Sequence, residues 1–177
     1  MTIGRRLFVI LGSIAITACV RPSEMSSEQL ASANLILANG TPAGTVQLLA
    51  KGEQLSLTIA ISGILDGPHG FHLHTAGKCK GPDFTSAGGH LNPMGKGHGT
   101  LSPGGSHLGD LPNIEIIDNH LASAATIKLS GPRTKVLQWL FDTDGTAVVV
   151  HSGADDYLTN PSGNAGPRVA CGILKQS

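Results

Sequence analysis

The feature that most limits the fold of this chain is a series of short apolar segments, each ended by turn-forming residues. The segments are rich in Val, Ile, Leu and Thr and cover residues 35–38, 45–49, 55–61, 114–117, 124–129, 147–151 and 169–174. Gly, Pro, Asn and Asp separate them, and the 177 residues include 24 Gly and 10 Pro. This pattern, without long helical periodicity, predicts one all-β antiparallel sandwich or barrel.

The charge balance excludes one class of partner. Twelve Lys and Arg residues stand against 12 Asp and Glu residues. No basic tract or stripe of the kind that binds nucleic acid is present, so we expect no nucleic-acid partner. The low charge and moderate hydrophobicity also argue against a disordered chain.

The N-terminus has the pattern of an export signal. Arg5 and Arg6 precede an apolar run over residues 7–18, which is typical of a secretory signal and too short for a stable membrane span. The sequence Ile16-Thr17-Ala18-Cys19 resembles a bacterial lipobox, in which the chain is cut before the Cys and the Cys is lipidated. An ordinary cleaved signal peptide with a coincidental Cys is the alternative.

These patterns predict a domain organisation and a location. We expect a signal peptide of the lipoprotein type over residues 1–18, a lipidated Cys19 and polar tether over residues 19–32, and one domain over residues 33–177. The mature chain would have 10 basic and 12 acidic residues, a net charge of −2 with neutral His. It would be exported to the bacterial cell envelope or periplasm and touch a membrane only through a lipid anchor at Cys19.

Two cysteines remain once Cys19 is assigned to the export signal. They are Cys79 and Cys171, and an oxidising compartment favours a disulfide between them. Their spacing excludes a CxxC metal site. Such a bridge would close a loop of over 90 residues, worth ~4–5 kcal/mol in the chain-entropy model.

The segment over residues 75–112 does not fit a simple strand pattern. It contains ten Gly between Gly77 and Gly109 and has no sustained period. A loop of this length within a compact domain needs something functional to organise it. Cys79 supplies one covalent tie, and the histidines suggest that a metal supplies another.

Seven residues form two candidate metal-ligand sets. His72 and His74 are spaced i, i+2, which places both on one face of a strand, and His151 ends the apolar run 147–151. Together with His90, these four imidazoles would suit copper. The set His90, His98, His107 and Asp110 offers three imidazoles and a carboxylate, a closed tetrahedral set that suits zinc.

At these positions the sequence resembles the copper/zinc superoxide dismutases over residues 33–174. The motifs that carry the resemblance are Gly-Phe-His72-Leu-His74, Ser-Ala-Gly-Gly-His90-Leu-Asn-Pro, His98-Gly, His107-Leu-Gly-Asp110-Leu, Val-Val-His151-Ser-Gly-Ala-Asp155-Asp156 and Gly-Asn-Ala-Gly-Pro-Arg168-Val-Ala-Cys171-Gly. The segment Asp155-Asp156-Tyr157, followed by Pro161-Ser162-Gly163-Asn164, resembles the exported bacterial branch. The resemblance implies an eight-stranded Greek-key β barrel or flattened sandwich with long metal-binding loops.

The resemblance also implies a role for each site residue. Copper would be held by His72, His74, His90 and His151, and zinc by His90, His98, His107 and Asp110, one ion of each per subunit, with His90 as the bridging imidazolate. Cys79 and Cys171 match the family disulfide. Arg168 matches the arginine that attracts and orients the anion, and Asp155 matches the aspartate that ties His72 to His98. His69 and His120 match no ligand position, and we interpret them as surface or loop histidines.

The implied reaction is the dismutation of superoxide to molecular oxygen and hydrogen peroxide, with Arg168 and His90 as catalytic residues. Copper would be alternately reduced and oxidised, His90 would take up a proton when it releases copper, and zinc would be structural. The enzyme would protect the cell envelope from superoxide, and a homodimer is compatible with the family. A copper-delivery or metal-buffering protein, or a noncatalytic domain of the same fold, is the rival interpretation. A zinc hydrolase is disfavoured because the zinc set leaves no open position for water.

Overall fold

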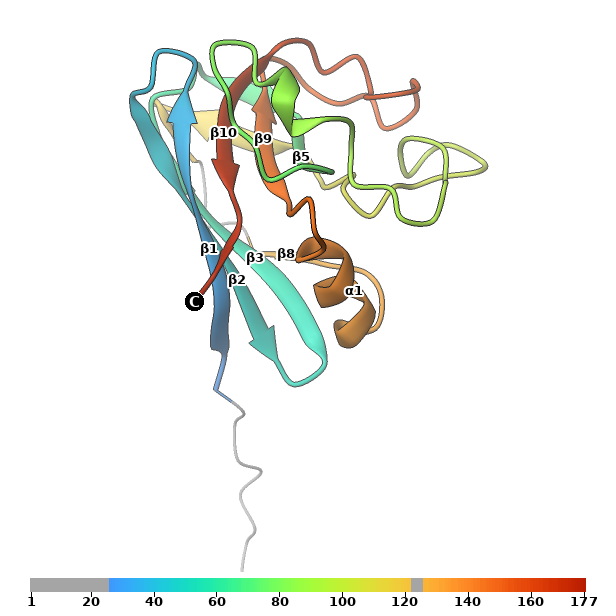
Figure 1. Ribbon diagram of the computed structural model, residues 1–177. Coiled ribbons are helices and arrows are strands. Elements are labelled where there is room, and N and C mark those ends of the chain that lie inside the picture. The colour runs from blue at the N-terminus through green and yellow to red at the C-terminus, as the bar shows by residue number, and fades with distance from the viewer. Residues whose placement is uncertain (1–25, 122–125) are drawn as a thin grey trace, which may run out of the picture.

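The dominant element of the fold is a strongly curled antiparallel sheet (Figure 1). The computed structural model describes residues 26–121 and 126–177. The strands of this sheet follow the order β5 (Phe71–His74), β9 (Ala147–His151), β10 (Arg168–Ile173), β1 (Glu28–Leu37), β2 (Pro42–Lys51), β3 (Gln54–Ile61) and β8 (Thr126–Lys128), and β11 (Lys175–Gln176) also pairs with β1.

A second, smaller sheet covers the core on the side of β3. It consists of β4 (Gly67–His69), β6 (Ile114–Ile117) and β7 (His120–Leu121) in that order. A single bridge between Ser62 and His120 links it to the end of β3. Among the described residues the helical elements are short, namely α1 (Arg133–Leu140) and the 3₁₀ turn η1 (Thr85–Ala87). The predicted all-β class is confirmed.

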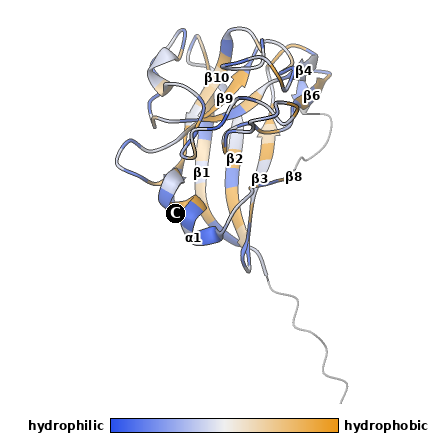
Figure 2. Cartoon of the chain, turned by 90° about the vertical axis from the view of Figure 1, so that its right-hand side faces the viewer, coloured by the Kyte–Doolittle hydropathy of each residue, from blue (hydrophilic) through white to orange (hydrophobic). Residues whose placement is uncertain are grey.

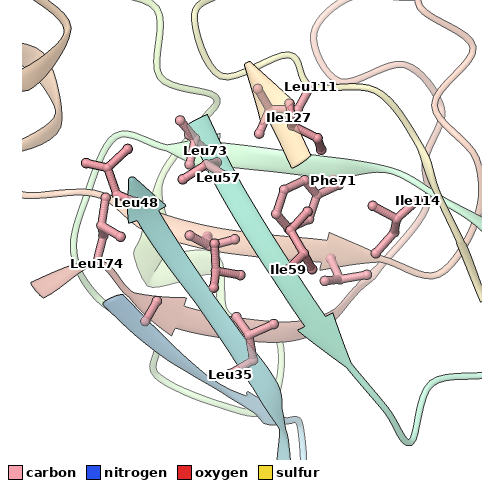
Figure 3. Packing of buried hydrophobic residues seen from close by; sticks show 14 of the residues in the cluster. Leu35, Leu48, Leu57, Ile59, Phe71, Leu73, Leu111, Ile114, Ile127 and Leu174 are labelled. Atoms are coloured by element: carbon pink, nitrogen blue, oxygen red, sulfur yellow. The ribbon is translucent and has the colours of Figure 1, made fainter. Parts of the chain in front are cut away.

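Aliphatic side chains from both sheets fill most of the core. Along β3 the buried residues alternate with less buried ones, so Leu55, Leu57, Ile59 and Ile61 face inward. The close view in Figure 3 shows how side chains from separate strands meet in this core, and the hydropathy colours in Figure 2 place the apolar residues along the strands. One large cluster thus joins the main sheet to β6 and to α1.

The edge of the sheet formed by β5 and β9 is buried on both faces. Phe71 and Leu73 of β5 pack into the core, whereas the alternate residues His72 and His74 lie on the opposite face. Residues 75–112 and 152–167 run at this side of the molecule, at the upper right of Figure 1. The i, i+2 spacing of the two histidines therefore directs both rings toward these loops.

The disulfide between Cys79 and Cys171 is confirmed, and it fastens the glycine-rich loop to β10. The two residues are 92 positions apart in sequence, and their Cα atoms lie 5.7 Å apart. Phe84 and Ala87 from the same loop pack beside the bridge, in a small buried cluster that also contains Val149 of β9. The loop therefore has an apolar contact that its sequence did not predict.

Two elements differ from the predicted organisation. Strand β1 begins at Glu28, so the predicted end of the tether at residue 32 is too late. The reason is that Ala31 and Ser32 pair with both β2 and β11, which makes this polar stretch part of the sheet. Helix α1 was not predicted, because only Val136 and Leu140 of its eight residues are buried.

The predicted signal peptide and the lipidated Cys19 lie outside the described residues. Within the described part of the chain, no helix has the length and apolar character needed to cross a membrane.

Removing the disulfide should destabilise the protein substantially. The double replacement Cys79→Ser with Cys171→Ala should lower the free energy of unfolding by about 4 kcal/mol, because the bridge closes a loop of some 90 residues in the unfolded chain. Urea unfolding of the metal-free protein measures this change. A reductant should produce a similar loss in the unmodified protein and none in the double variant, and an unmodified protein insensitive to reductant would contradict the prediction.

Candidate metal centre

The seven predicted ligand residues come together as two clusters that share one histidine. The ligand atoms of each cluster lie within 4.8 Å of one another, and nearly all of the residues are buried. The first cluster consists of His72, His74, His90 and His151, and the second of His90, His98, His107 and Asp110. The structure thus assembles both sets in the grouping predicted from the sequence.

Hydrogen bonds fix the orientation of three rings in the first cluster. His74 donates from Nδ1 to the Gly88 carbonyl (2.9 Å), and His151 donates from Nδ1 to the Gly166 carbonyl (2.8 Å). His72 uses the other nitrogen, because its Nε2 lies 2.7 Å from Oδ2 of Asp155. In each bond the ring nitrogen carries the proton and donates it, so the other nitrogen of the neutral ring keeps its lone pair.

The remaining nitrogens of this cluster have no partner among the described residues. Nδ1 of His72 and Nε2 of His74, His90 and His151 are buried and make no hydrogen bond. Burial lowers the pKa of His74 to about 2 and those of His90 and His151 to about 4. The rings of His74, His90 and His151 are therefore neutral near pH 7, and neutral imidazole is the form that binds a metal. Four unpartnered nitrogens around one point fit a bound ion.

The second cluster is organised by one carboxylate oxygen. Oδ1 of Asp110 lies 2.8 Å from Nδ1 of His90, 3.1 Å from Nδ1 of His98 and 2.9 Å from Nδ1 of His107. Burial acts to raise the pKa of Asp110, but hydrogen bonds from His90 and from the N–H groups of Gly99 and His107 outweigh it, so the pKa lies below its usual range. Three imidazole nitrogens around an ionised carboxylate form a set that fits zinc.

Backbone pairing brings the ligands of the glycine-rich loop to β5. His72 is bridged to Asp110, and His74 is bridged to His90. Between these pairs, the Leu73 N–H donates to the Gly109 carbonyl (3.0 Å), and the Leu91 N–H donates to the Leu73 carbonyl (2.8 Å). Gly109 is required here, because a Cβ at this position would overlap the Leu73 carbonyl oxygen.

Asp155 connects the two clusters outside the shared His90. Its Oδ2 lies 2.7 Å from Nε2 of His72, and its Oδ1 lies 3.0 Å from Nε2 of His98. Burial acts to raise the pKa of Asp155, but the hydrogen bonds from His72, His98 and the Tyr157 N–H hold it below its usual value. The ionised carboxylate orients one ring of each cluster, the geometry that the sequence resemblance implied.

Arg168 lies at the opening of the first cluster. Its guanidinium donates to the Phe84 carbonyl (2.7 Å) and to the Gly88 carbonyl (2.6 Å), and Gly88 is also the acceptor for His74. The cluster opens into a cavity of about 380 Å³, whose lining residues are His74, Gly89, His90, Asn92, His107, His151, Pro161, Ser162, Gly166 and Arg168. Arg168 is the one Lys or Arg of this lining, so it gives the opening a local positive charge.

The interpretation of His69 as a surface or loop histidine is wrong. His69 belongs to β4 and is buried, with Nδ1 2.7 Å from the His151 carbonyl and Nε2 2.8 Å from the Leu65 carbonyl. No motif signals this role, because both partners are backbone atoms. His120 is exposed, although it lies in strand β7 and not in a loop.

Several residues that support the site were not predicted. Asn113 holds the backbone of Asp155 with two hydrogen bonds of 2.9 Å, and Asn160 accepts the His98 N–H (2.8 Å). Gly163 must lack a side chain, because a Cβ there would overlap the Asp155 carboxylate. In the sequence, a glycine within a motif-rich loop is only a weak signal of such a supporting role, and the two asparagines give no signal.

Comparison with known proteins agrees with this geometry. Residues 42–174 match the sequence family described as copper/zinc superoxide dismutase. The chain is 37% identical to superoxide dismutase [Cu-Zn] 2 of Aquifex aeolicus over 94% of this chain and 96% of that protein. It is 38% identical to superoxide dismutase [Cu-Zn] of Caulobacter vibrioides over 77% of this chain and 80% of that protein.

Solved structures show the same fold. The crystal structure of a double mutant of a superoxide dismutase-like protein from Bacillus subtilis matches with a TM-score of 0.72 at 38% identity, covering 81% of this chain and 95% of that one. The Cu/Zn superoxide dismutase from Brucella abortus matches with a TM-score of 0.62 at 26% identity, covering 85% and 100%. The chain therefore belongs to the copper/zinc superoxide dismutase family, as an enzyme of that class with copper and zinc as its cofactors.

Proposed function

We propose that the first cluster holds the copper and the second the zinc, one of each per subunit, and that the protein uses them to dismutate superoxide. The observation that carries this assignment is the set of four buried nitrogens without partners, which converge beside Arg168. Copper prefers such a nitrogen set, whereas the mixed set around Asp110 suits zinc. The family membership supports the reaction, and the chemistry of the donors supports the division of the metals.

The shared ring of His90 is the residue that we assign to proton transfer. Its Nδ1 faces Asp110 in the second cluster, and its Nε2 points into the first. Copper, when bound, supplies one-electron oxidation and reduction between two valence states. His90 can hold a proton at Nε2 when that atom is not a ligand, and it can deliver this proton to a substrate in the adjoining cavity. Its orientation does not change, because Nδ1 stays anchored.

We assign to Arg168 the attraction and orientation of the anionic substrate. The guanidinium is fixed by the Phe84 and Gly88 carbonyls, which leaves N–H groups free to face the cavity. Superoxide is a small anion, and the mature chain would carry a net charge of −2. A local positive charge at the opening, and not the net charge, would therefore guide the substrate.

We also propose export and lipid anchoring, with protection of the cell envelope as the role. The support comes from Arg5, Arg6, the apolar run and the Ile16-Thr17-Ala18-Cys19 motif. The disulfide is consistent with an oxidising compartment. Strand β1 begins at the lower end of the sheet in Figure 1, away from the loops of the metal centre, so an anchor before it would leave the cavity open.

Replacement of one ligand in each cluster should separate the two metals. His151→Ala should remove copper and dismutase activity and leave the fold, because the second cluster organises the loop independently. Asp110→Ala should lose zinc and lower stability, since a structural metal contributes folding free energy. Metal analysis of the purified protein, a direct dismutation assay and thermal unfolding give the readouts. Loss of the same metal and the same stability in both variants would show that the division is wrong.

Arg168→Gln should lower the second-order rate by roughly tenfold while both metals stay bound. Electrostatic attraction, for which superoxide dismutases are an established example, raises association rates by roughly 10 to 10³-fold. Salt screens the attraction of an exposed charge, because the Debye length is only about 8 Å at physiological salt. Once the charge of Arg168 is removed, the rate should therefore depend less on ionic strength. Arg168→Lys should fall between, since it keeps the charge and loses the planar fork. Stopped-flow rates at several salt concentrations test this, and an unchanged rate and salt slope in the fully metallated Gln variant would refute the role.

Cys19→Ser should abolish lipid attachment. A bacterial strain that expresses the variant and is fed a labelled fatty acid should incorporate no label into this chain, whereas the unmodified protein should be labelled and found with the membranes. Mass spectrometry of the unmodified protein should show a mature N-terminus at Cys19. An N-terminus well downstream of Cys19, on a product found in solution, would count against the anchor.

A further inference from the structure

Residues 156–164 form a compact turn built around the carboxylate of Asp156. This carboxylate accepts the N–H groups of Leu158 (2.9 Å) and Thr159 (2.8 Å) and the hydroxyl of Thr159 (2.6 Å). The Asn164 side chain closes the turn with a bond of 3.2 Å. These bonds, led by the Thr159 hydroxyl, lower the pKa of Asp156 to about 2. The turn therefore has its own internal structure and can act as a fixed support for what it contacts.

The turn is fastened to the loop that carries His98. The Leu101 N–H donates to the Tyr157 carbonyl (3.0 Å), and the Asn113 N–H donates to the Tyr157 hydroxyl (2.7 Å). The backbone of Gly99 passes so close to Tyr157 that a Cβ there would overlap the Tyr157 carbonyl oxygen. The contacts of Gly99, Leu101 and Asn113 therefore fasten the turn to the chain that follows His98.

His98 is held by this turn at its backbone and by Asp155 at its ring. The His98 N–H donates to Oδ1 of Asn160 (2.8 Å), and Nε2 lies 3.0 Å from Oδ1 of Asp155. The ring is fully buried, and its remaining nitrogen, Nδ1, faces Asp110. Asn160 and Asp155, which both lie outside the loop that contains His98, therefore fix its backbone and one ring nitrogen. Together they determine the position of Nδ1 in the second cluster.

We propose that Asn160 is a positioning residue for the zinc ligand His98. This inference rests on the proposed assignment of zinc to the second cluster. The amide oxygen of Asn160 fixes the backbone of His98, so that Nδ1 reaches the ion without a change in the ring orientation set by Asp155. Loss of a group that orients a metal ligand typically weakens metal binding by roughly 10–100-fold. Asn160 acts one step further back, on the backbone, so we expect an effect at the lower end, about tenfold.

The test compares three variants of the mature protein after its metals are removed. Asn160→Ala removes the acceptor oxygen, and Asn160→Asp keeps an oxygen that can accept the His98 N–H. Asn39→Ala is the matched control, because the Asn39 side chain likewise accepts a backbone N–H, that of Thr41 (3.0 Å), in the turn between β1 and β2. Two readouts are used: the zinc dissociation constant from competition with a coloured chelator, and the visible spectrum of Co²⁺ bound in place of zinc.

Asn160→Ala should raise the zinc dissociation constant about tenfold and change the Co²⁺ spectrum, which reports the tetrahedral geometry. Asn160→Asp should return both close to the values of the unmodified protein, and Asn39→Ala should change neither. An Asn160→Ala variant with a lower melting temperature but unchanged zinc affinity and Co²⁺ spectrum would overturn the proposal, because Asn160 would then only stabilise the loop. A failure of Asn160→Asp to restore the affinity would overturn it too.

The Co²⁺ spectra of the unmodified protein and of Asp110→Ala separate a failure of this proposal from a failure of the proposed zinc assignment. The zinc assignment itself is wrong if the unmodified protein shows no tetrahedral Co²⁺ spectrum, or if the Asp110→Ala variant still shows that spectrum. The role of Asn160 is then rejected with it. If that spectrum is present and depends on Asp110, only the comparison of Asn160→Ala with Asn160→Asp decides the role of Asn160.

Discussion

The carboxylate of Asp110 is the common hydrogen-bond partner of three histidines on the long segment over residues 75–112. Three imidazole nitrogens approach one of its oxygens, and the N–H groups of Gly99 and His107 approach the other at 2.8 and 2.9 Å. Residues 75–112 are rich in glycine and add few side chains to the core, among them Phe84 and Ala87 beside the disulfide. Their conformation therefore depends also on polar contacts of this kind and on the disulfide. A cation among the three imidazoles would strengthen the arrangement, because zinc binding contributes directly to folding.

The sheet supplies the rigid side of the centre. In the ladder between β5 and β9, Phe71 pairs with Val150 and His72 pairs with Val149, and both strands are buried on both faces. Across the next ladder, Arg168 pairs with His151. Strand pairing alone therefore fixes the spacing of the two β5 histidines, His151 and the arginine. The loops need only bring His90 and the remaining ligands to this edge.

The sequence predicts the strands and the grouping of the seven cluster residues well because both have a simple physical signature. Alternating aliphatic residues identify β2 and β3, and a continuous aliphatic run identifies β9. Seven His and Asp residues in a characteristic order identify the two clusters. What escaped prediction depends on partners distant in the chain. The start of β1 is polar and becomes a strand through pairing with β2 and β11, and α1 buries only two side chains. His69 looks like a spare surface histidine, yet the carbonyls of His151 and Leu65 occupy both of its nitrogens.

Two separate connections run between the clusters, and their combination explains why the surrounding loop is so constrained. His90 belongs to both clusters, and Asp155 binds one ring of each, at 2.7 Å to His72 and 3.0 Å to His98. A single shared ring would let one cluster rotate about the other, whereas a second connection removes that freedom. The second connection requires the carboxylate to sit in a narrow space, and Gly163, with φ +66°, leaves room for it where any Cβ would overlap. If His90 takes up a proton at Nε2, as we propose, Asp155 still holds His72, and the Gly88 and Gly166 carbonyls still hold His74 and His151. The three other nitrogens of the first cluster would then keep their places.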